Sequence, residues 1–205
     1  MAVITLPSAF KIREIEWDLS QPSQVNRSQW SGADQVEEET WHSRWRAAVT
    51  FAPLGSDARL LRSLIAKLKG RVNTIRLPVT SEDQHSIVTP QRVYGAHAAG
   101  ATTLYTYGWH AVLPSLLDGH FLTINDQMAM VTEDAAPPGV GEIGTGEPGA
   151  RKFTLHAPLR AAATHSTQIT TLRPTCLMAL AEDVAGWKTD VGKISSFSLA
   201  FEERY

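Results

Sequence analysis

The sequence predicts a mainly β protein with one α-helix and a small β-barrel inserted into its first domain. Two observations favour strands: short segments alternate between apolar and polar residues, and Gly, Pro and Asn-Asp pairs separate them. A single apolar stripe at helical spacing predicts the one helix. We expect the first domain to comprise residues 1–87 and 172–205, and the inserted barrel to comprise residues 88–171.

Strict alternation is clearest in residues 41–51, where one face is apolar and the other carries Arg, His and Thr. This pattern is typical of a strand with one buried face. Residues 15–19 alternate in the same way, and we expect both strands in one antiparallel sheet. Because Trp17, Trp41 and Trp45 lie on the apolar faces, packing in the core is the favoured role for all three.

The predicted helix covers residues 56–69. Ser56 can cap its N-terminus, and Gly70 is placed to end it. The stripe that we expect to dock on the sheet consists of Leu60, Leu61, Leu64, Ile65 and Leu68.

A long polar connection, residues 20–39, separates the first two strands and leaves two interpretations open. It is either a solvated surface loop or an extended hairpin that packs on a neighbouring subunit. Trp30 in its middle favours the hairpin, because an isolated Trp in a polar segment usually has a binding partner. The candidate subunit-interface residues are Trp30, Glu37, Glu38 and Glu39.

Shorter elements follow Pro78. Residues 121–124 and 127–131 flank Asn125-Asp126 and predict a β-hairpin. Residues 135–150 are rich in Gly and Pro and predict a flexible tip, after which Phe153 and Leu155 alternate into a further strand. Alternation returns in two closing segments, at Leu177 and Ala179 and at Phe197, Leu199 and Phe201.

The composition is that of a globular protein without an excess of basic residues. Among 205 residues, 43% are apolar and 20% charged, and the formal net charge of -2 argues against phosphate-backbone binding as the main role. Because Cys176 is the one cysteine of the sequence, an intrachain disulfide is excluded, and we expect Cys176 to be a small buried hydrophobic residue. The first residues lack a signal-peptide leader and no segment is long enough to span a membrane, so we expect folding where the chain is made.

Catalytic and cofactor motifs are not recognisable in the sequence. Residues 144–149 are glycine-rich but lack the Gly-Lys-Ser/Thr ending of a phosphate loop. The seven histidines do not follow metal-ligand spacing. Carboxylates on adjacent residues of a strand point to opposite faces, so they make a poor acid-base pair. This applies to Glu133-Asp134, Glu182-Asp183 and Glu202-Glu203. We therefore expect no catalytic residue, no cofactor and no metal site.

A series of short motifs covers some two thirds of the chain from Trp41 onward. These motifs are residues 45–53, a helix ending in Leu68-Lys69-Gly70-Arg71, Tyr107-Gly108-Trp109, residues 116–122, Met130-Val131-Thr132 and residues 153–160. Their order resembles that of the distal tail proteins, and related tail-tip proteins, of phages with long non-contractile tails (siphophages).

The resemblance implies a tail-tube-like antiparallel β-sandwich with one flanking α-helix that assembles as a homohexameric ring. Such a ring joins the tail tube protein to hub or tip proteins and to receptor-binding or fibre proteins. It surrounds the tape-measure protein, and DNA passes through it only in transit. The resemblance thus implies a non-enzymatic structural protein of the virion tail tip, made in the host cytoplasm.

Two other function classes stay open. The first is a carbohydrate- or protein-binding β module of the tail tip, with Tyr105, Tyr107 and Trp109 as candidate surface-binding residues. The second is a tail-associated hydrolase, which would need histidines or carboxylates that are distant in sequence to converge in a pocket.

Overall fold

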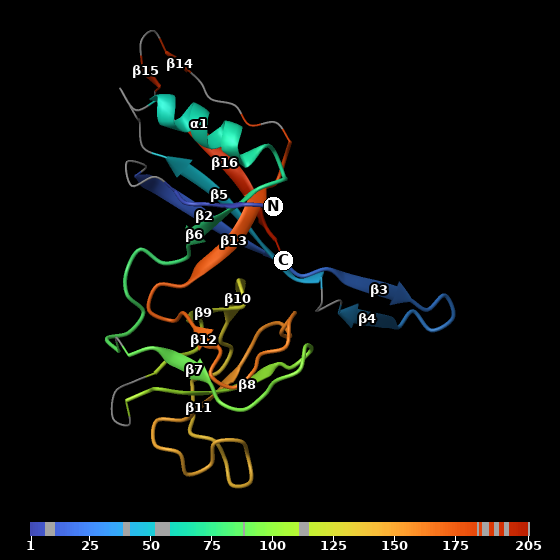
Figure 1. Ribbon diagram of the computed structural model, residues 1–205. Helices are drawn as coiled ribbons and strands as arrows, with labels where there is room; N and C mark the ends of the chain where they lie inside the picture. Colours follow the sequence, from blue (N-terminus) through green and yellow to red (C-terminus); the bar gives the residue numbers. More distant parts are fainter. Residues whose placement is uncertain are drawn as a thin grey trace. The chain divides into compact units, whose positions relative to one another are not determined.

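The computed structural model describes residues 1–6, 11–38, 42–51, 58–87, 89–110, 115–183, 185, 189–190, 193–194 and 197–204. The chain is mainly β with one α-helix, as predicted. It divides into two compact units: unit 1 is Met1–Leu77 with Leu177–Tyr205, and unit 2 is Pro78–Cys176 (Figure 1). The predicted insertion, residues 88–171, falls within unit 2.

The main element of unit 1 is a six-stranded sheet in the order β1-β6-β13-β16-β5-β2. Its strands are β1 (Val3–Ile4), β2 (Ile12–Ser20), β5 (Arg44–Phe51), β6 (Thr74–Pro78), β13 (Thr175–Leu180) and β16 (Phe197–Glu203). β1 runs parallel to β6, whereas β2, β5 and β16 pair antiparallel. A short hairpin of β14 (Thr189–Asp190) and β15 (Lys193–Ile194) also belongs to unit 1.

The predicted alternation of β5 and its pairing with β2 are confirmed. Every second residue of β5 is buried, and Trp17 of β2 lies opposite Ala47. Trp45 is 5% exposed and meets the partly buried Trp17 edge to face, with ring centroids 6.4 Å apart. β16 alternates as predicted, and Phe197 stacks on Phe51 at 4.7 Å between centroids. These strands bury their apolar faces together, as the period-two pattern requires.

The alternation predicted at Leu177 and Ala179 is wrong. All five residues from Cys176 to Leu180 are buried, including the intervening Met178. β13 lies in the interior of the sheet, between β6 and β16. A central strand that is covered on both faces carries a continuous apolar run, so alternation is lost.

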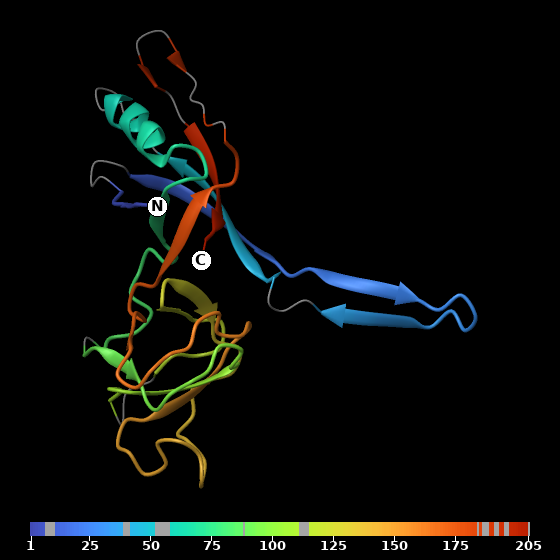
Figure 2. The ribbon, with the colours of Figure 1, turned by 45° about the vertical axis from the view of Figure 1, so that its right-hand side comes forward.

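Helix α1 (Ala58–Leu68) confirms the predicted helix. Its buried stripe consists of Leu61, Leu64 and Leu68. Lys69 and Gly70 have φ angles of 51° and 61°, a left-handed conformation that ends the helix. The predicted cap Ser56 lies outside the described residues, as does Trp41. Figures 1 and 2 both show α1 against one face of the sheet.

Unit 2 contains a four-stranded antiparallel sheet and a separate hairpin. The sheet has the order β11-β8-β7-β12, with β7 (Gln91–Val93), β8 (Thr103–Tyr107), β11 (Arg151–Thr154) and β12 (Gln168–Ile169). The predicted hairpin is confirmed as β9 (Phe121–Ile124) and β10 (Gln127–Met130). Positive φ angles of 48° at Asn125 and 63° at Asp126 match the tight turn that such a pair favours.

The strands described in unit 2 do not form the closed barrel that the sequence predicts. The ends of the four-stranded sheet are not paired with each other. Isolated bridges at Thr123↔Thr170 and Val131↔Leu155, rather than continuous ladders, link the hairpin to neighbouring segments. The two sheets instead share an apolar core that includes Leu104, Leu122 and Phe153.

His156 is a partly buried titratable group of this unit. Its Nδ1 accepts a hydrogen bond from the Met130 backbone N–H at 2.9 Å, beside the end of β10. Burial lowers the pKa of His156 from 6.5 to about 4. The imidazole is therefore neutral in the folded protein at neutral pH, and its protonation opposes folding.

We predict that Trp45→Ala lowers the free energy of unfolding by about 3–5 kcal/mol, because it empties a buried site in the β5 face. Arg46→Ala is the matched control, since the Arg46 side chain is 59% exposed and lies 3.7 Å from Glu202. It should cost less than about 1 kcal/mol. Urea unfolding measures both effects, and similar small losses for the two variants would contradict the burial pattern of β5.

We predict that stability falls as the pH drops from 6.5 toward 4. The unfolded chain protonates His156 near its ordinary pKa, whereas the folded chain resists protonation until about pH 4. His156→Asn keeps an acceptor for the Met130 N–H and removes this titration. Denaturant unfolding across the pH range should show the variant losing about 1–3 kcal/mol less than the unmodified chain. If the free energy of unfolding depends on pH in the same way in both proteins, His156 is not the group that causes the loss of stability.

Candidate functional site

The long polar connection of unit 1 is an extended β-hairpin, as the second interpretation predicts, and its packing on a neighbouring subunit stays a prediction. β3 (Ser23–Arg27) pairs antiparallel with β4 (Asp34–Glu38). Every residue of β3 is exposed. We call β3, β4 and the turn between them the hairpin arm. Figures 1 and 2 show it as a ribbon that continues from β2 toward β5 and leaves the six-stranded sheet.

Hydrogen bonds among residues close in the sequence form the turn at the tip of the hairpin arm. The Ser28 N–H donates to the Ala33 carbonyl at 2.9 Å, and the Gly32 N–H donates to the Ser28 carbonyl at 3.0 Å. The Ser28 hydroxyl accepts from the N–H groups of Trp30 and Ser31 at 3.3 and 3.2 Å. Gly32 has a φ of 66°, a left-handed conformation that glycine adopts at little cost. Ser and Gly at these positions thus specify the turn.

The hairpin arm exposes large apolar side chains. Trp30, at the tip, is 99% exposed. Val25 and Val36 are directly paired and share a face, and they are 59% and 64% exposed. An isolated two-stranded ribbon is at best marginal in water, and apolar groups exposed on it make the arm a candidate binding surface. The arrangement favours a partner that covers this face and the tip.

Glu37 and Glu38, two of the acidic residues predicted at the interface, lie at the base of the hairpin arm. Glu37 is exposed and accepts a hydrogen bond from the Gln35 side chain at 3.1 Å. Its position in β4 puts it on the face opposite Val36. The main chain of Glu38 pairs with Ser23, and Glu39 lies outside the described residues.

A second candidate surface is the outer face of the four-stranded sheet in unit 2. Tyr105 and Tyr107 of β8 are partly exposed there and alternate with buried Leu104 and Thr106. Lys152 lies opposite Tyr105 across the β11–β8 pair. Cross-strand partners share a face, so the same surface also carries Arg92 opposite Tyr107 and Gln168 opposite Arg92. We call this surface the aromatic face.

Two residues beside these strands complete the aromatic face. Tyr107 and the exposed His165 stack with centroids 5.5 Å apart and planes 9° apart. Tyr94 meets both edge to face, at 5.8 Å from Tyr107 and 5.4 Å from His165. Tyr105 stacks on the buried His97 at 5.7 Å. No motif in the sequence marks Tyr94 or His165, because the turns that bring them to β8 are not encoded by any local period.

Trp109 does not belong to this surface, which corrects the expectation that it is a surface-binding residue. It is 5% exposed and meets Phe153 edge to face at 5.5 Å in the core of unit 2. Its indole N–H donates to the buried Thr106 hydroxyl at 2.8 Å. The buried hydroxyl satisfies the one polar group of the indole, so the whole ring can leave water.

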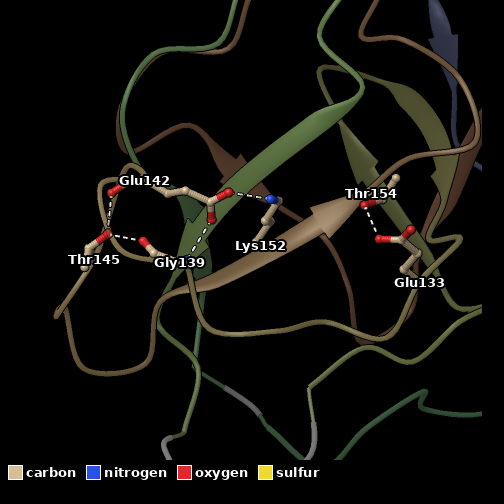
Figure 3. Close-up of polar contacts among 6 residues, drawn as sticks. All are labelled: Glu133, Gly139, Glu142, Thr145, Lys152 and Thr154. Atoms are coloured by element: carbon tan, nitrogen blue, oxygen red, sulfur yellow. Dashed lines mark hydrogen bonds and ion pairs between the residues drawn. The ribbon is translucent and has the colours of Figure 1, made fainter.

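The glycine-rich segment that was predicted to be a flexible tip holds several internal hydrogen bonds (Figure 3). Glu142 accepts from the Gly139 N–H at 2.7 Å and from the Lys152 ammonium at 2.5 Å. The Thr145 hydroxyl lies 2.5 Å from the Gly139 carbonyl oxygen and 2.6 Å from that of Glu142. Figure 3 shows Glu142 and Lys152 pointing toward one another from the loop and from β11.

This loop borders the aromatic face. The hydrogen bond with Lys152 lowers the pKa of the Glu142 carboxyl and raises that of the ammonium. Burial and then the negative charge of Glu142 raise the pKa of Tyr105. Gly95 has a φ of 79°, and a Cβ there would lie 2.9 Å from Ile143 Cγ2. Glycine at position 95 therefore lets the loop approach the sheet.

Metal clusters and membrane-spanning helices are not found in the part of the chain that the structure describes. No three or more His, Cys, Asp or Glu residues there are grouped to hold a metal ion. No described helix is long and apolar enough to cross a membrane.

Comparison with models of known protein families gives no match, and no curated protein matches the chain. The exposed arm and the aromatic face are therefore the features from which a function can be argued.

We predict that Glu142→Gln lowers the pKa of Tyr105, because it removes a nearby negative charge that opposes ionisation of the phenol. The titration can be followed by the chemical shift of the Tyr105 ring carbon bonded to oxygen. Glu147→Gln, an exposed change in the same loop, should leave that titration unaltered. An unchanged Tyr105 titration in Glu142→Gln would contradict the described approach of the loop to β8.

Proposed function

We propose that this protein is a structural subunit of a long non-contractile phage tail: a ring-forming distal tail protein that joins the tail tube to hub and receptor-binding proteins. The observation that carries the proposal is the hairpin arm, which exposes Trp30, Val25 and Val36 to solvent. The resemblance of the motifs from Trp41 onward to distal tail proteins supports it. In this view unit 1 is the tail-tube-like sandwich domain, and unit 2 is the module inserted into it.

The exposed arm supports a ring rather than a symmetric pair. An arm that reaches from one subunit to a different surface on the next makes a heterologous contact. Heterologous contacts close into rings when the rotation between subunits divides a full turn. The six-fold symmetry that we propose comes from the resemblance to distal tail proteins.

The edges of the six-stranded sheet favour the same assembly. Among the described strands β1 and β2 are its edges, and β2 is nine residues long. The outward residues Glu14, Glu16 and Asp18 are exposed and charged, which discourages unspecific edge-to-edge pairing. A neighbouring subunit bound by the hairpin arm could cover such an edge, whereas the charged residues of β2 would keep unrelated chains away.

A ring of this kind would contact the tail tube protein on one side and hub, tip or fibre proteins on the other. It would surround the tape-measure protein and let DNA pass. The formal net charge of -2 per chain is compatible with a conduit that does not retain DNA.

We predict that shortening the hairpin arm prevents assembly. In the test variant an Asn-Gly turn replaces residues 23–38, which should leave unit 1 folded because the whole of β3 is exposed. Light scattering and negative-stain electron microscopy should show six-fold rings for the unmodified chain and monomers for the variant. Immunogold labelling of tails from the encoding phage should mark the tail tip only when the arm is intact.

Trp30→Ala and Glu37→Gln provide a matched pair within the arm. Removal of the exposed indole should weaken assembly by at least about tenfold if Trp30 is an anchor of the interface. Glu37→Gln changes a charge on the other face and should have a smaller effect. Incorporation of the shortened chain into tails as efficiently as the unmodified chain would reject the proposed role of the arm.

A further inference from the structure

We propose that the aromatic face of unit 2 binds a saccharide chain, specifically a neutral oligosaccharide of linked pyranose rings. This inference uses residues other than those of the hairpin arm, and it does not depend on assembly into a ring. Its central residues are Tyr94, Tyr105, Tyr107 and His165.

The rings of the aromatic face are held in place before any ligand arrives. Tyr107 is fixed by stacking on His165 and by a 2.9 Å hydrogen bond between its hydroxyl and that of Ser166. Tyr105 is fixed by stacking on His97. Each tyrosine of the face is nevertheless partly exposed. Aromatic side chains that are already ordered lose little conformational entropy on binding, and their exposed surface can contact the C–H faces of pyranose rings.

Hydrogen-bonding groups surround the rings. His165 Nδ1 accepts from the Gly95 N–H at 3.1 Å, so the neutral ring carries its proton on Nε2 and can donate it. Arg92 and Gln168 are exposed and lie in one cross-strand row with Tyr107. A surface that mixes donors and acceptors with a few apolar rings matches the alternating C–H and hydroxyl groups of a sugar.

The strand residues of the aromatic face carry no aliphatic side chain that points outward in the described part of the sheet. Beside the tyrosines, the outward positions are Arg92, Thr103, Lys152, Thr154 and Gln168. The apolar area that the strand residues contribute is therefore aromatic alone, and the loop beside them adds Ile143, which is 42% exposed. An extensive protein interface usually also has a closely packed apolar centre, which these positions do not supply.

The few cationic groups on the aromatic face favour a neutral saccharide over a polyanion as its ligand. The Lys152 ammonium is paired with Glu142 at 2.5 Å. Arg92, the cation in the row with Tyr107, donates through Nη1 to the Ser166 carbonyl at 3.0 Å and keeps further N–H groups for a ligand. A nucleic acid or a heavily sulfated glycan requires several basic groups along its backbone. One guanidinium beside tyrosines instead suits hydroxyl groups, to which it donates hydrogen bonds.

The test is a glycan array of hexopyranose oligosaccharides, including chitohexaose, cellohexaose and laminarihexaose, probed with the full chain. Saturation-transfer NMR on the strongest binder would then show which sugar protons contact the protein. We expect binding at micromolar to millimolar concentration, weakened at least about tenfold by Tyr107→Ala and by His165→Ala. Tyr107→Phe keeps the ring and should retain most of the affinity.

Trp30→Ala is the reciprocal control, because it removes an exposed aromatic residue from unit 1. It should weaken assembly and leave saccharide binding unchanged, whereas His165→Ala should do the reverse. Circular dichroism verifies the fold of each variant, and His165 is exposed enough to be replaced without emptying a core site. Absence of any bound glycan at millimolar concentration would overturn the inference. Binding that survives both Tyr107→Ala and His165→Ala would also overturn it.

Discussion

Each strand of this protein has two faces, and the structure depends on what covers each of them. In β5 and β16 one face enters a shared core that includes Trp45 and Phe201, and the other face meets water. In β13 both faces are covered, and its residues from Cys176 to Leu180 are all buried. In the hairpin arm neither face of β3 is covered. The hairpin arm is therefore the part of unit 1 for which we propose a partner.

The two candidate surfaces differ in how far their side chains are held in place before a partner binds. The hairpin arm has exposed apolar groups but little structure of its own to stabilise it, which suits a contact formed during assembly. The aromatic face has rings that are already oriented by mutual stacking, which suits a small ligand that cannot order its own site. Because the surfaces lie in separate units, mutations can test the role proposed for each surface independently.

His156 and Glu142 are two polar side chains of unit 2 that stabilise its fold. His156 is kept neutral by burial and accepts a backbone hydrogen bond at the end of β10. Glu142 holds the glycine-rich loop through Gly139 and Lys152, although the composition of that loop predicts flexibility. A few well-placed acceptors can thus order a segment that lacks regular secondary structure.

By itself the sequence determined the mainly β class, the strand of residues 44–51, helix α1 and the β9–β10 hairpin, because each depends on a local period or on turn residues such as Asn125. It also identified Trp30 as an unusual residue in a polar segment. Tertiary structure alone decided that Trp109 is buried, that β13 is central, and that Tyr94 and His165 meet Tyr107. The physical reason is that burial and ring contacts arise from segments far apart in the chain, whereas a periodic pattern reports only which neighbours share a face.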